Sequence, residues 1–250
     1  MPKKDNKMKQ VFLTVKENIA LTDSVYRMVL SGDVSGVTNC GQFVNLKLDG
    51  LFLRRPISVC DCTDGELTLV YKVVGKGTEQ MSKMSGGEVL DVLTGLGNGY
   101  DTSVSGEAPL LIGGGVGVPP MYMLCKRLIC EGKKPTVILG FNKADEVFYE
   151  KEFEALGATV LVSTVDGSYG VRGFVTDAMA DVDYSYFYTC GPEPMLKAVH
   201  RATKSSGQFS FEERMGCGFG ACMGCSCKTV TGYKRICKEG PVLCKEEILW

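Results

Sequence analysis

The chain has 250 residues, a length that suits two modest domains and a small additional segment. Its formal net charge of −1 excludes the strongly basic surface that nucleic acids or anionic membranes require. We expect neither a signal peptide nor a membrane span. The lysine-rich residues 1–10 precede no apolar core, and glycines and prolines interrupt the richest apolar stretch, residues 110–124.

Twelve cysteines and a single histidine, His200, restrict the metal chemistry that is open to the chain. Without a secretory signal we expect reduced thiols and a cytoplasmic location. One histidine is too few for a zinc site of two cysteines and two histidines, and it leaves little basis for a histidine-dependent triad. Six cysteines clustered between residues 217 and 244 are candidate ligands. The other six occupy apolar or strand-like contexts and are expected to be buried thiols: Cys40, Cys60, Cys62, Cys125, Cys130 and Cys190.

The N-terminal part shows short β-rich runs separated by glycine and aspartate turns. Strands are predicted at residues 25–30, 42–48, 56–59 and 67–71. Their spacing is typical of an antiparallel barrel, which we assign to residues 8–104.

Three fragments of this barrel carry groups that suit a dinucleotide. Arginine offers a fork for pyrophosphate, serine and strand backbone suit a flavin ring edge, and amides that open a helix favour phosphate. Taken singly, the arginine also fits a surface ion pair, and the start of the short helix also fits a plain cap. The fragments are Arg55-Pro56-Ile57-Ser58, Val70-Tyr71-Lys72 and Gly77-Thr78.

From about residue 109 the pattern changes to alternating strands and helices. Strands are predicted at residues 110–112, 136–141, 159–164 and 184–189, and helices between them reach residue 130 and cover 146–156, 173–180 and 195–204. The alternation predicts a parallel α/β domain over residues 105–208. Past residue 207 the periodicity disappears, glycine and cysteine dominate, and we assign residues 209–250 to a separate segment that binds a metal centre through its cysteines.

Two glycine-containing loops follow strands of this domain. One holds Gly113, Gly114, Gly115 and Gly117, and the other holds Cys190, Gly191 and Pro192. Both fall at carboxyl ends of predicted strands, where α/β sheets bind ligands, so together they indicate a nicotinamide dinucleotide site. A glycine-rich turn taken singly also fits tight packing.

The residue that follows the third strand of this domain bears on the choice of nucleotide. Asp166 would repel a 2′-phosphate and so favours NAD, whereas Lys143 leaves NADP open.

The strongest motif lies near the C-terminus. Cys217, Cys222 and Cys225 have Cys-x4-Cys-x2-Cys spacing, and Cys237 follows eleven residues later. This spacing is typical of a [2Fe-2S] cluster, and the interspersed glycines would let backbone N–H groups approach the sulfurs. A four-cysteine structural zinc site is the alternative. The spare thiols Cys227 and Cys244 are less suited as the fourth ligand, because a hairpin that turns at residues 231–232 would return Cys237 to the loop.

Taken together, these motifs resemble the ferredoxin reductase-like flavoproteins, in which a flavin barrel precedes a nicotinamide domain. More narrowly, Arg55-Pro56-Ile57-Ser58, the segment 213–222 and the segment 237–242 resemble electron-transfer subunits of type B dihydroorotate dehydrogenases. The resemblance implies FAD on the three barrel fragments and a cluster on Cys217, Cys222, Cys225 and Cys237. Two positions depart from the wider family: Ile57 replaces a flavin-stacking tyrosine, and Lys72 replaces an arginine.

The resemblance implies an oxidoreductase subunit that has no catalytic residue for an organic substrate of its own. Hydride chemistry moves two electrons and a cluster accepts one, so a flavin must link them. NAD would act as a diffusible co-substrate, and an FMN-containing dihydroorotate dehydrogenase subunit would be the partner, in a dimer of heterodimers that serves pyrimidine biosynthesis. Two alternatives stay open: the equivalent subunit of a sulfide-, sulfite- or ferredoxin-linked NAD(P)H oxidoreductase, and a non-enzymatic zinc-binding adaptor.

Overall fold

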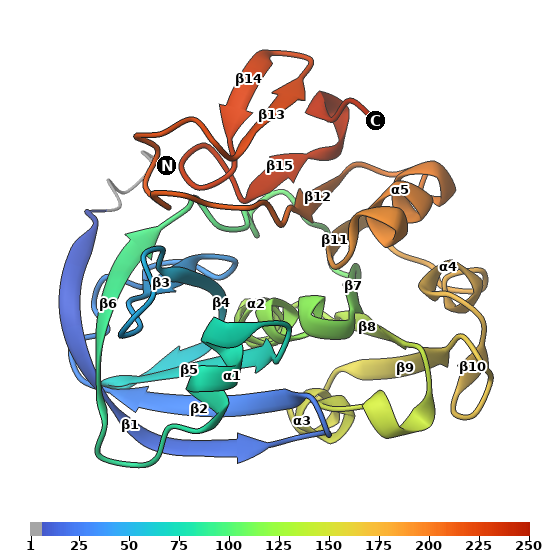
Figure 1. Cartoon of the computed structure of the whole chain (residues 1–250). Coiled ribbons are helices and arrows are strands. Elements are labelled where there is room, and N and C mark those ends of the chain that lie inside the picture. The colour runs from blue at the N-terminus through green and yellow to red at the C-terminus, as the bar shows by residue number, and fades with distance from the viewer. Residues whose placement is uncertain (1–6) are drawn as a thin grey trace.

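A β-barrel, a parallel α/β sheet and a C-terminal cysteine-rich segment follow one another along the chain (Figure 1). The computed structural model describes residues 7–250, so the predicted lysine-rich N-terminal segment lies partly outside the described residues. Across residues 7–250 no helical segment combines the length and the apolar character of a bilayer span.

Six antiparallel strands close the barrel in the order β1-β2-β5-β4-β3-β6. The strands are Lys9–Ala20 (β1), Val25–Ser31 (β2), Phe43–Leu46 (β3), Arg55–Thr63 (β4), Glu66–Lys72 (β5) and Val89–Leu96 (β6), and helix α1 (Lys76–Ser82) connects the last two. Alternate side chains point inward, so apolar residues such as Leu13, Met28, Val44 and Leu69 fill the interior. The barrel prediction is confirmed, although the sequence pattern missed β1 and β6.

A seven-stranded sheet in the order β10-β9-β8-β7-β11-β12-β15 forms the second part. Its strands are β7 (Pro109–Gly114), β8 (Thr136–Phe141), β9 (Thr159–Thr164), β10 (Val171–Arg172), β11 (Tyr186–Cys190), β12 (Gly207–Ser210) and β15 (Val242–Cys244). All neighbours are parallel except β12 and β15. The sheet therefore continues past residue 207, where the sequence showed no periodicity, and its edge strand comes from the C-terminal segment.

Helices cover both faces of the sheet because successive residues of its central strands point to opposite sides. Leu110 and Ile112 of β7 pack against α4 (Val175–Ala178) and α5 (Glu193–Ala202). Leu111 packs on the other face against α2 (Pro119–Cys130) and α3 (Glu150–Ala155). Two observed helices are shorter than their predicted ranges: α3 is shorter than residues 146–156, and α4 is shorter than residues 173–180. In the first, only a 3-10 turn (Ala144–Glu146) precedes α3, because Tyr149 adopts φ of 69° and interrupts the helical path.

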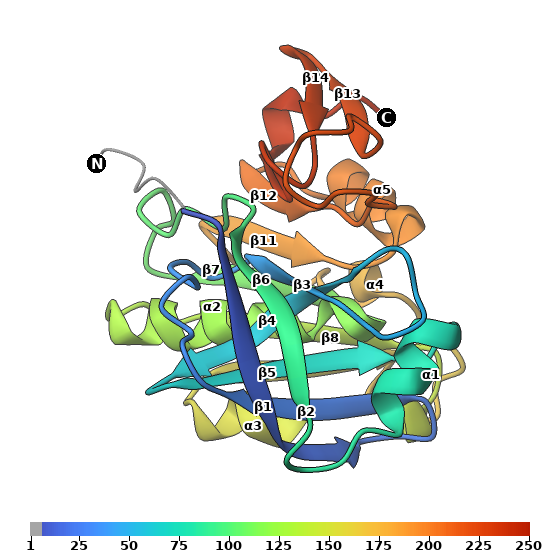
Figure 2. The same ribbon diagram turned by 60° about the vertical axis from the view of Figure 1, so that its left-hand side comes forward.

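One apolar cluster crosses the junction between the barrel and the sheet. Met121 and Leu124 of α2, with Val118 just before the helix, belong to this cluster together with Cys60 of β4 and Val70 of β5. In Figures 1 and 2 the C-terminal segment lies over the junction between the two parts.

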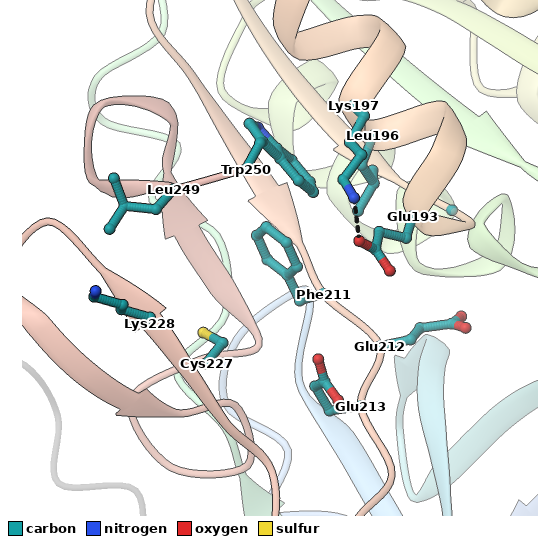
Figure 3. A pocket seen from close by; sticks show the side chains of 11 residues that line it. Glu193, Leu196, Lys197, Phe211, Glu212, Glu213, Cys227, Lys228, Leu249 and Trp250 are labelled. Atoms are coloured by element: carbon teal, nitrogen blue, oxygen red, sulfur yellow. Dashed lines mark ion pairs between the residues drawn. The ribbon is translucent and has the colours of Figure 1, made fainter.

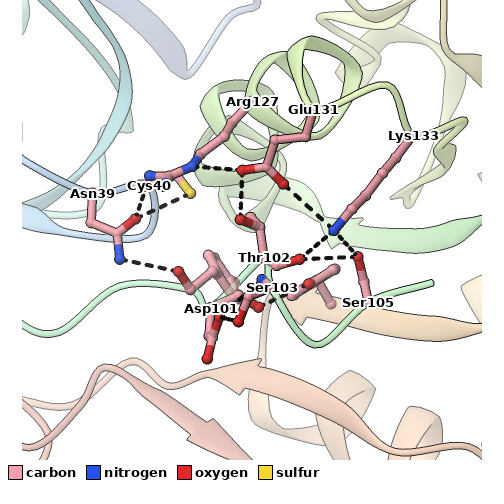
Figure 4. Close-up of polar contacts among 11 residues, drawn as sticks. Asn39, Cys40, Asp101, Thr102, Ser103, Ser105, Arg127, Glu131 and Lys133 are labelled. Carbon is pink, nitrogen blue, oxygen red and sulfur yellow. Dashed lines mark hydrogen bonds and ion pairs between the residues drawn. The ribbon is translucent and has the colours of Figure 1, made fainter. Parts of the chain in front are cut away.

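Polar contacts reinforce this junction (Figure 4). The guanidinium of Arg127 on α2 donates to Asn39 Oδ1 of the barrel at 3.0 Å and to Glu131 at 3.1 Å. Thr102, in the connection between the parts, donates to Glu131 at 2.8 Å. A second tie joins Lys126 of α2 to Asp61 of β4 at 2.9 Å. Arg127 and Lys126 of α2 therefore help to fix the orientation of the barrel relative to the sheet.

The expectation that six scattered cysteines are buried is wrong for Cys130 and only partly right for Cys62. Cys130 is exposed because it is the last residue of α2. Cys62, near the end of β4, is half-buried, whereas the other four are buried.

Candidate functional site

The cysteine-rich loop between β12 and the hairpin β13 (Ser226–Thr229) and β14 (Gly232–Arg235) packs on the outer wall of the barrel. Cys225 and Cys237 belong to one apolar cluster with Phe43 of β3 and with Leu93 and Leu96 of β6. The predicted hairpin is present, and the N–H of Ile236 donates to the carbonyl of Cys225 at 3.1 Å. The hairpin thus returns Cys237 to the loop.

Backbone N–H groups point at the sulfurs of this loop. Ala221 N–H donates to Cys217 Sγ at 3.2 Å, and Gly224 N–H donates to Cys222 Sγ at 3.5 Å. Cys237 N–H donates to Cys225 Sγ at 3.4 Å. Such donors stabilise the thiolate form that binds metals.

Cys217 and Cys237 differ in how readily they ionise. Burial opposes ionisation of Cys217, but N–H groups of Phe219, Cys222 and Ala221 outweigh it and lower the pKa of Cys217 to about 6. Burial, with the neighbouring thiol of Cys225, raises the pKa of Cys237 to about 12. The exposed end of the loop therefore offers a thiolate at neutral pH, while the buried end keeps its proton until a metal displaces it.

Side-chain hydrogen bonds join the thiols as two pairs, Cys217 with Cys222 and Cys225 with Cys237, and the charge of Cys217 also acts on Cys237. Within residues 7–250, no three His, Cys, Asp or Glu side chains converge as the ligands of one metal ion would. Two thiol pairs suit the two irons of a [2Fe-2S] cluster held by four cysteines. The residues present fit that cluster better than a single zinc ion.

The spare thiols lie apart from these pairs. Cys227, on β13, lines a cavity of about 230 Å³ between the hairpin, α5 and the C-terminal Trp250 (Figure 3). Cys244 ends β15, and its N–H donates to Glu247 at 3.0 Å. Burial raises the pKa of both thiols.

An arginine clamps the loop from the hairpin side. Arg235 donates to the carbonyl of Gly220 at 2.6 Å and forms an ion pair with Glu239. This guanidinium lowers the pKa of Glu239 to about 2. Because Gly220 lies between Cys217 and Cys222 and Glu239 follows Cys237, Arg235 ties the loop to the residues after the fourth cysteine.

The barrel fragments lie on β4, β5 and α1, which follow one another along the chain. Arg55 lies over Gly77 so closely that a Cβ at Gly77 would sit 2.2 Å from its Nε. Arg55 Nη1 donates to the carbonyl of Leu53 at 2.5 Å. Arginine and glycine thus form a shallow cradle at the start of α1, which fits a pyrophosphate approached by backbone and guanidinium together.

Successive residues of β4 after Arg55 face opposite sides of the strand. Pro56 and Ser58 pair with Asn45 and Phe43 of β3, so these four share one side of the sheet. Ile57 packs against the barrel core.

The side chains of two further barrel residues already have partners. The hydroxyl of Tyr71 donates to Asn18 at 2.9 Å, and that of Thr78 caps α1 through Val74 N–H at 2.9 Å. Val70 is buried, whereas Lys72 is exposed. For Tyr71 and Thr78, only the backbone is available to a ligand.

The two glycine loops meet at the carboxyl edge of the sheet. Cys190 pairs with Gly113 across β11 and β7. A Cβ at Gly117 would lie 2.2 Å from the Cys190 carbonyl oxygen, and one at Gly114 would lie 2.4 Å from Met195 Sδ. These glycines therefore let the loops touch. Gly191 has φ of 158° and lies against Met195, and Pro192 precedes α5.

Gly115 differs from its neighbours, because nothing lies within 4 Å of its Cβ position and its φ is 52°. The loop is thus open on this side, as a cradle for a dinucleotide requires. Asp166 follows β9, two strands away from β7, and accepts hydrogen bonds from Ser168 N–H and Oγ at 2.9 and 2.6 Å. These bonds lower the pKa of Asp166 and keep it charged.

One buried polar residue beside the cysteine loop was missed. Asn45 on β3 donates to the carbonyl of Cys217 at 3.3 Å across 172 positions of sequence. A pattern of neighbouring residues cannot reveal such a contact.

Comparisons with known proteins agree with this arrangement. Residues 212–249 match the iron-sulfur cluster binding domain of dihydroorotate dehydrogenase B, and residues 111–201 match an oxidoreductase NAD-binding domain. A solved NADH-dependent reduced ferredoxin-NADP oxidoreductase is 29% identical with a TM-score of 0.87, covering 97% of this chain and 91% of that one. The ferredoxin reductase of carbazole 1,9a-dioxygenase, at 22% identity and a TM-score of 0.68 over 78% and 64%, shares the fold.

Two curated relatives match almost end to end. One, from Bacillus pumilus, is 44% identical over 96% of this chain and 98% of its own length. Another, from Fusobacterium nucleatum, is 43% identical over 94% and 96%. Both are named dihydroorotate dehydrogenase B (NAD(+)), electron transfer subunit. On this likeness, and on the barrel, sheet and cysteine loop that accompany it, the chain belongs to the family of dihydroorotate dehydrogenase B electron transfer subunits.

Proposed function

We propose that this chain passes electrons between NAD and an FMN-containing dihydroorotate dehydrogenase subunit, as one step of pyrimidine biosynthesis. The observation that carries the proposal is the position of the cysteine loop, which packs on the barrel wall beside the strand that bears Arg55. A one-electron centre and a flavin must lie close together to exchange electrons. The names of the relatives supply the substrate class.

FAD is the cofactor we assign to the barrel, where it would exchange electrons both singly and in pairs. Arg55 would bind the pyrophosphate from above Gly77. The backbone of Val70, Tyr71, Lys72 and Thr78, with Pro56, Ile57 and Ser58 on β4, would line the rest of the site. Cys217, Cys222, Cys225 and Cys237 would hold the [2Fe-2S] cluster.

NAD would bind as a co-substrate at the carboxyl edge of the sheet. The open side of Gly115 admits a phosphate, and Gly113, Gly114, Gly117, Cys190, Gly191 and Pro192 shape the floor. The charged Asp166 at the end of β9 disfavours a 2′-phosphate and supports NAD over NADP.

The barrel, the sheet and the cysteine-rich segment account for the described residues, and none of them forms a separate domain for an organic substrate. We therefore assign dihydroorotate oxidation to the partner. Phe219 and Met223 of the cysteine loop are 43% and 52% exposed and offer apolar contacts to that partner. We place the complex in the cytoplasm as a dimer of heterodimers, the symmetric arrangement that a two-fold interface favours.

Co-expression with an FMN-type dihydroorotate dehydrogenase subunit tests the proposal. The purified complex should reduce NAD when dihydroorotate is added. The chain alone should pass electrons from NADH to an artificial acceptor and leave dihydroorotate unchanged.

Two results would contradict the assignment. Oxidation of dihydroorotate by the chain alone would give it a substrate site. Efficient reduction of ferredoxin, with no coupling to the FMN subunit, would instead assign the chain to the ferredoxin-linked oxidoreductases, to which the structure that is 29% identical is related.

A further inference from the structure

The side chain of Asn45 lies between the barrel and the cysteine loop. It points out of the barrel, because its strand neighbours Val44 and Leu46 belong to the barrel core. The loop covers it so completely that the residue is 1% exposed. Its Nδ2 donates to the Cys217 carbonyl at 3.3 Å. Asn45 is therefore in direct contact with the first residue of the cysteine motif.

The backbone of the cysteine loop makes room for the Asn45 amide at Gly218. Gly218 has φ of 78°, and a Cβ there would lie 2.3 Å from Asn45 Nδ2. The absence of a side chain at residue 218 thus lets the loop descend onto Asn45.

Stability alone gives no reason for an asparagine here. Its Oδ1 is buried and makes no hydrogen bond within the described residues. A buried acceptor without a partner costs more than one neutral hydrogen bond returns, and an apolar residue of the same shape avoids that cost. Unsatisfied buried polar groups in folded proteins call for an explanation, and a redox role is one of those known.

Asn45 is also held by a rigid frame. Its backbone pairs with Pro56 of β4, next to Arg55. Its carbonyl accepts from Arg54 Nη1 at 3.3 Å, and Arg54 Nη2 donates to both carboxylate oxygens of Asp91 at 2.9 and 3.0 Å. Asn45 therefore cannot move away from the cysteine loop without disturbing β4, the strand that bears Arg55.

From these contacts we propose that Asn45 is a positioning residue for electron exchange between cluster and flavin: its amide seats the Cys217 end of the loop on the barrel and favours the reduced cluster. This inference rests on the proposed function, which places the cluster on the four cysteines. The positive end of the amide dipole faces the loop, so it stabilises added negative charge. Hydrogen bonding and solvent exposure around the sulfurs are the levers that set cluster potentials.

The test compares Asn45→Leu, which keeps the shape and removes both polar atoms, with the intact holoprotein. Asn39→Leu is the matched control, since it removes a barrel amide that bonds Tyr100 and Arg127 and not the cysteine loop. The readouts are FAD content, the rate of flavin reduction by NADH, and an EPR-monitored redox titration of the cluster.

In Asn45→Leu we expect FAD content and flavin reduction by NADH to match the intact protein. The ratio of reduced to oxidised cluster at a fixed potential should fall roughly three- to tenfold, as the loss of one hydrogen bond predicts, with shifted EPR g-values. Asn39→Leu should titrate like the intact protein. If Asn45→Leu is insoluble, Asn45→Ser, whose side chain is too short to reach Cys217, decides in its place.

A soluble Asn45 variant with unchanged g-values and an unchanged titration would overturn the inference. The same shift in Asn39→Leu would also overturn it, because the effect would then be general. Failure of the proposed function gives a different result: the intact protein itself would lack a cluster signal or fail to oxidise NADH.

Discussion

Cys217 ionises readily, because loop N–H groups lower its pKa to about 6. In protein stripped of iron by a chelator, we expect iodoacetamide at pH 7 to modify Cys217 well before Cys227, whose pKa burial raises. The absolute rate at Cys217 should fall as the pH drops below about 6 and Cys217 gains its proton, and its advantage over Cys227 should narrow only at high pH, where Cys227 also ionises. Peptide mass spectrometry measures both rates, and equal labelling at pH 7 would contradict the pKa difference.

The fourth ligand can be identified by paired substitutions. Cys237→Ser should remove most of the iron and labile sulfide, because Cys237 lies against Cys225 inside the apolar cluster. Cys244→Ser should retain both, since Cys244 lies on β15 beside Glu247. Iron and sulfide assays per chain provide the measurement. Severe loss with Cys244→Ser and none with Cys237→Ser would reverse the assignment.

Arg55 should bind the flavin more than it stabilises the fold. Arg55→Ala removes a charge-assisted contact worth roughly 1.5–3 kcal/mol, so FAD affinity should fall by about one to two decades. Lys83→Ala is the control, since Lys83 is an exposed cation just past α1 that pairs with Glu79. Fluorescence titration of FAD into stripped protein gives both affinities. Unchanged affinity in Arg55→Ala would exclude Arg55 from the site.

Sequence patterns predicted some of these residues and missed others for a physical reason. The spacing of Cys217, Cys222 and Cys225 is local, so it is visible in the sequence. The burial of Asn45 beneath Cys217 depends on a contact across 172 positions, which no local pattern encodes. Ile57 was predicted only in part. Its strand was predicted, but its contact with the barrel core depends on the neighbouring strands.

At the scale of elements, the turn between β7 and α2 offers a direct test of dinucleotide binding. Gly115 and Gly132 both have positive φ and open space around their Cβ positions. Alanine at either should therefore cost a similar 1–2 kcal/mol, approximately, of unfolding free energy. Only Gly115→Ala should raise KM for NADH, because only that loop faces the proposed site. Equal KM values for NADH in the two variants would show that Gly115 is not part of the dinucleotide site.

Element types were more predictable than element limits. The strands β7, β8 and β9 are short apolar runs that stand out in sequence, and β7 and β8 are largely buried on both faces. Strand β1 was missed because a bulge between Val15 and Glu17 breaks its alternation. Strand β15 has only three residues, and its pairing with β12 depends on the fold that precedes it.

At the scale of the molecule, the C-terminal segment is part of the core. Leu243 is buried in the cluster that contains Cys225 and Cys237, whereas Leu249 is exposed. Leu243→Ala should lower the free energy of unfolding by roughly 2–5 kcal/mol and reduce cluster retention, while Leu249→Ala should change little. Urea unfolding with parallel iron assays checks both. An intact cluster in a strongly destabilised Leu243→Ala protein would contradict the expected link between packing of the C-terminal segment and cluster retention.

The edge position of β15 has a consequence for the order in which the chain matures. The barrel closes with β6, and the parallel strands are complete at β12, so both can form before the cysteine-rich residues that follow them are synthesised. Asn98 donates to the carbonyls of Glu239 and Val242 at 3.0 and 2.7 Å, and these bonds must wait until those later residues have been synthesised. The cysteine loop can therefore dock on a scaffold that is already folded, so we expect iron delivery to follow the folding of the barrel and the parallel strands.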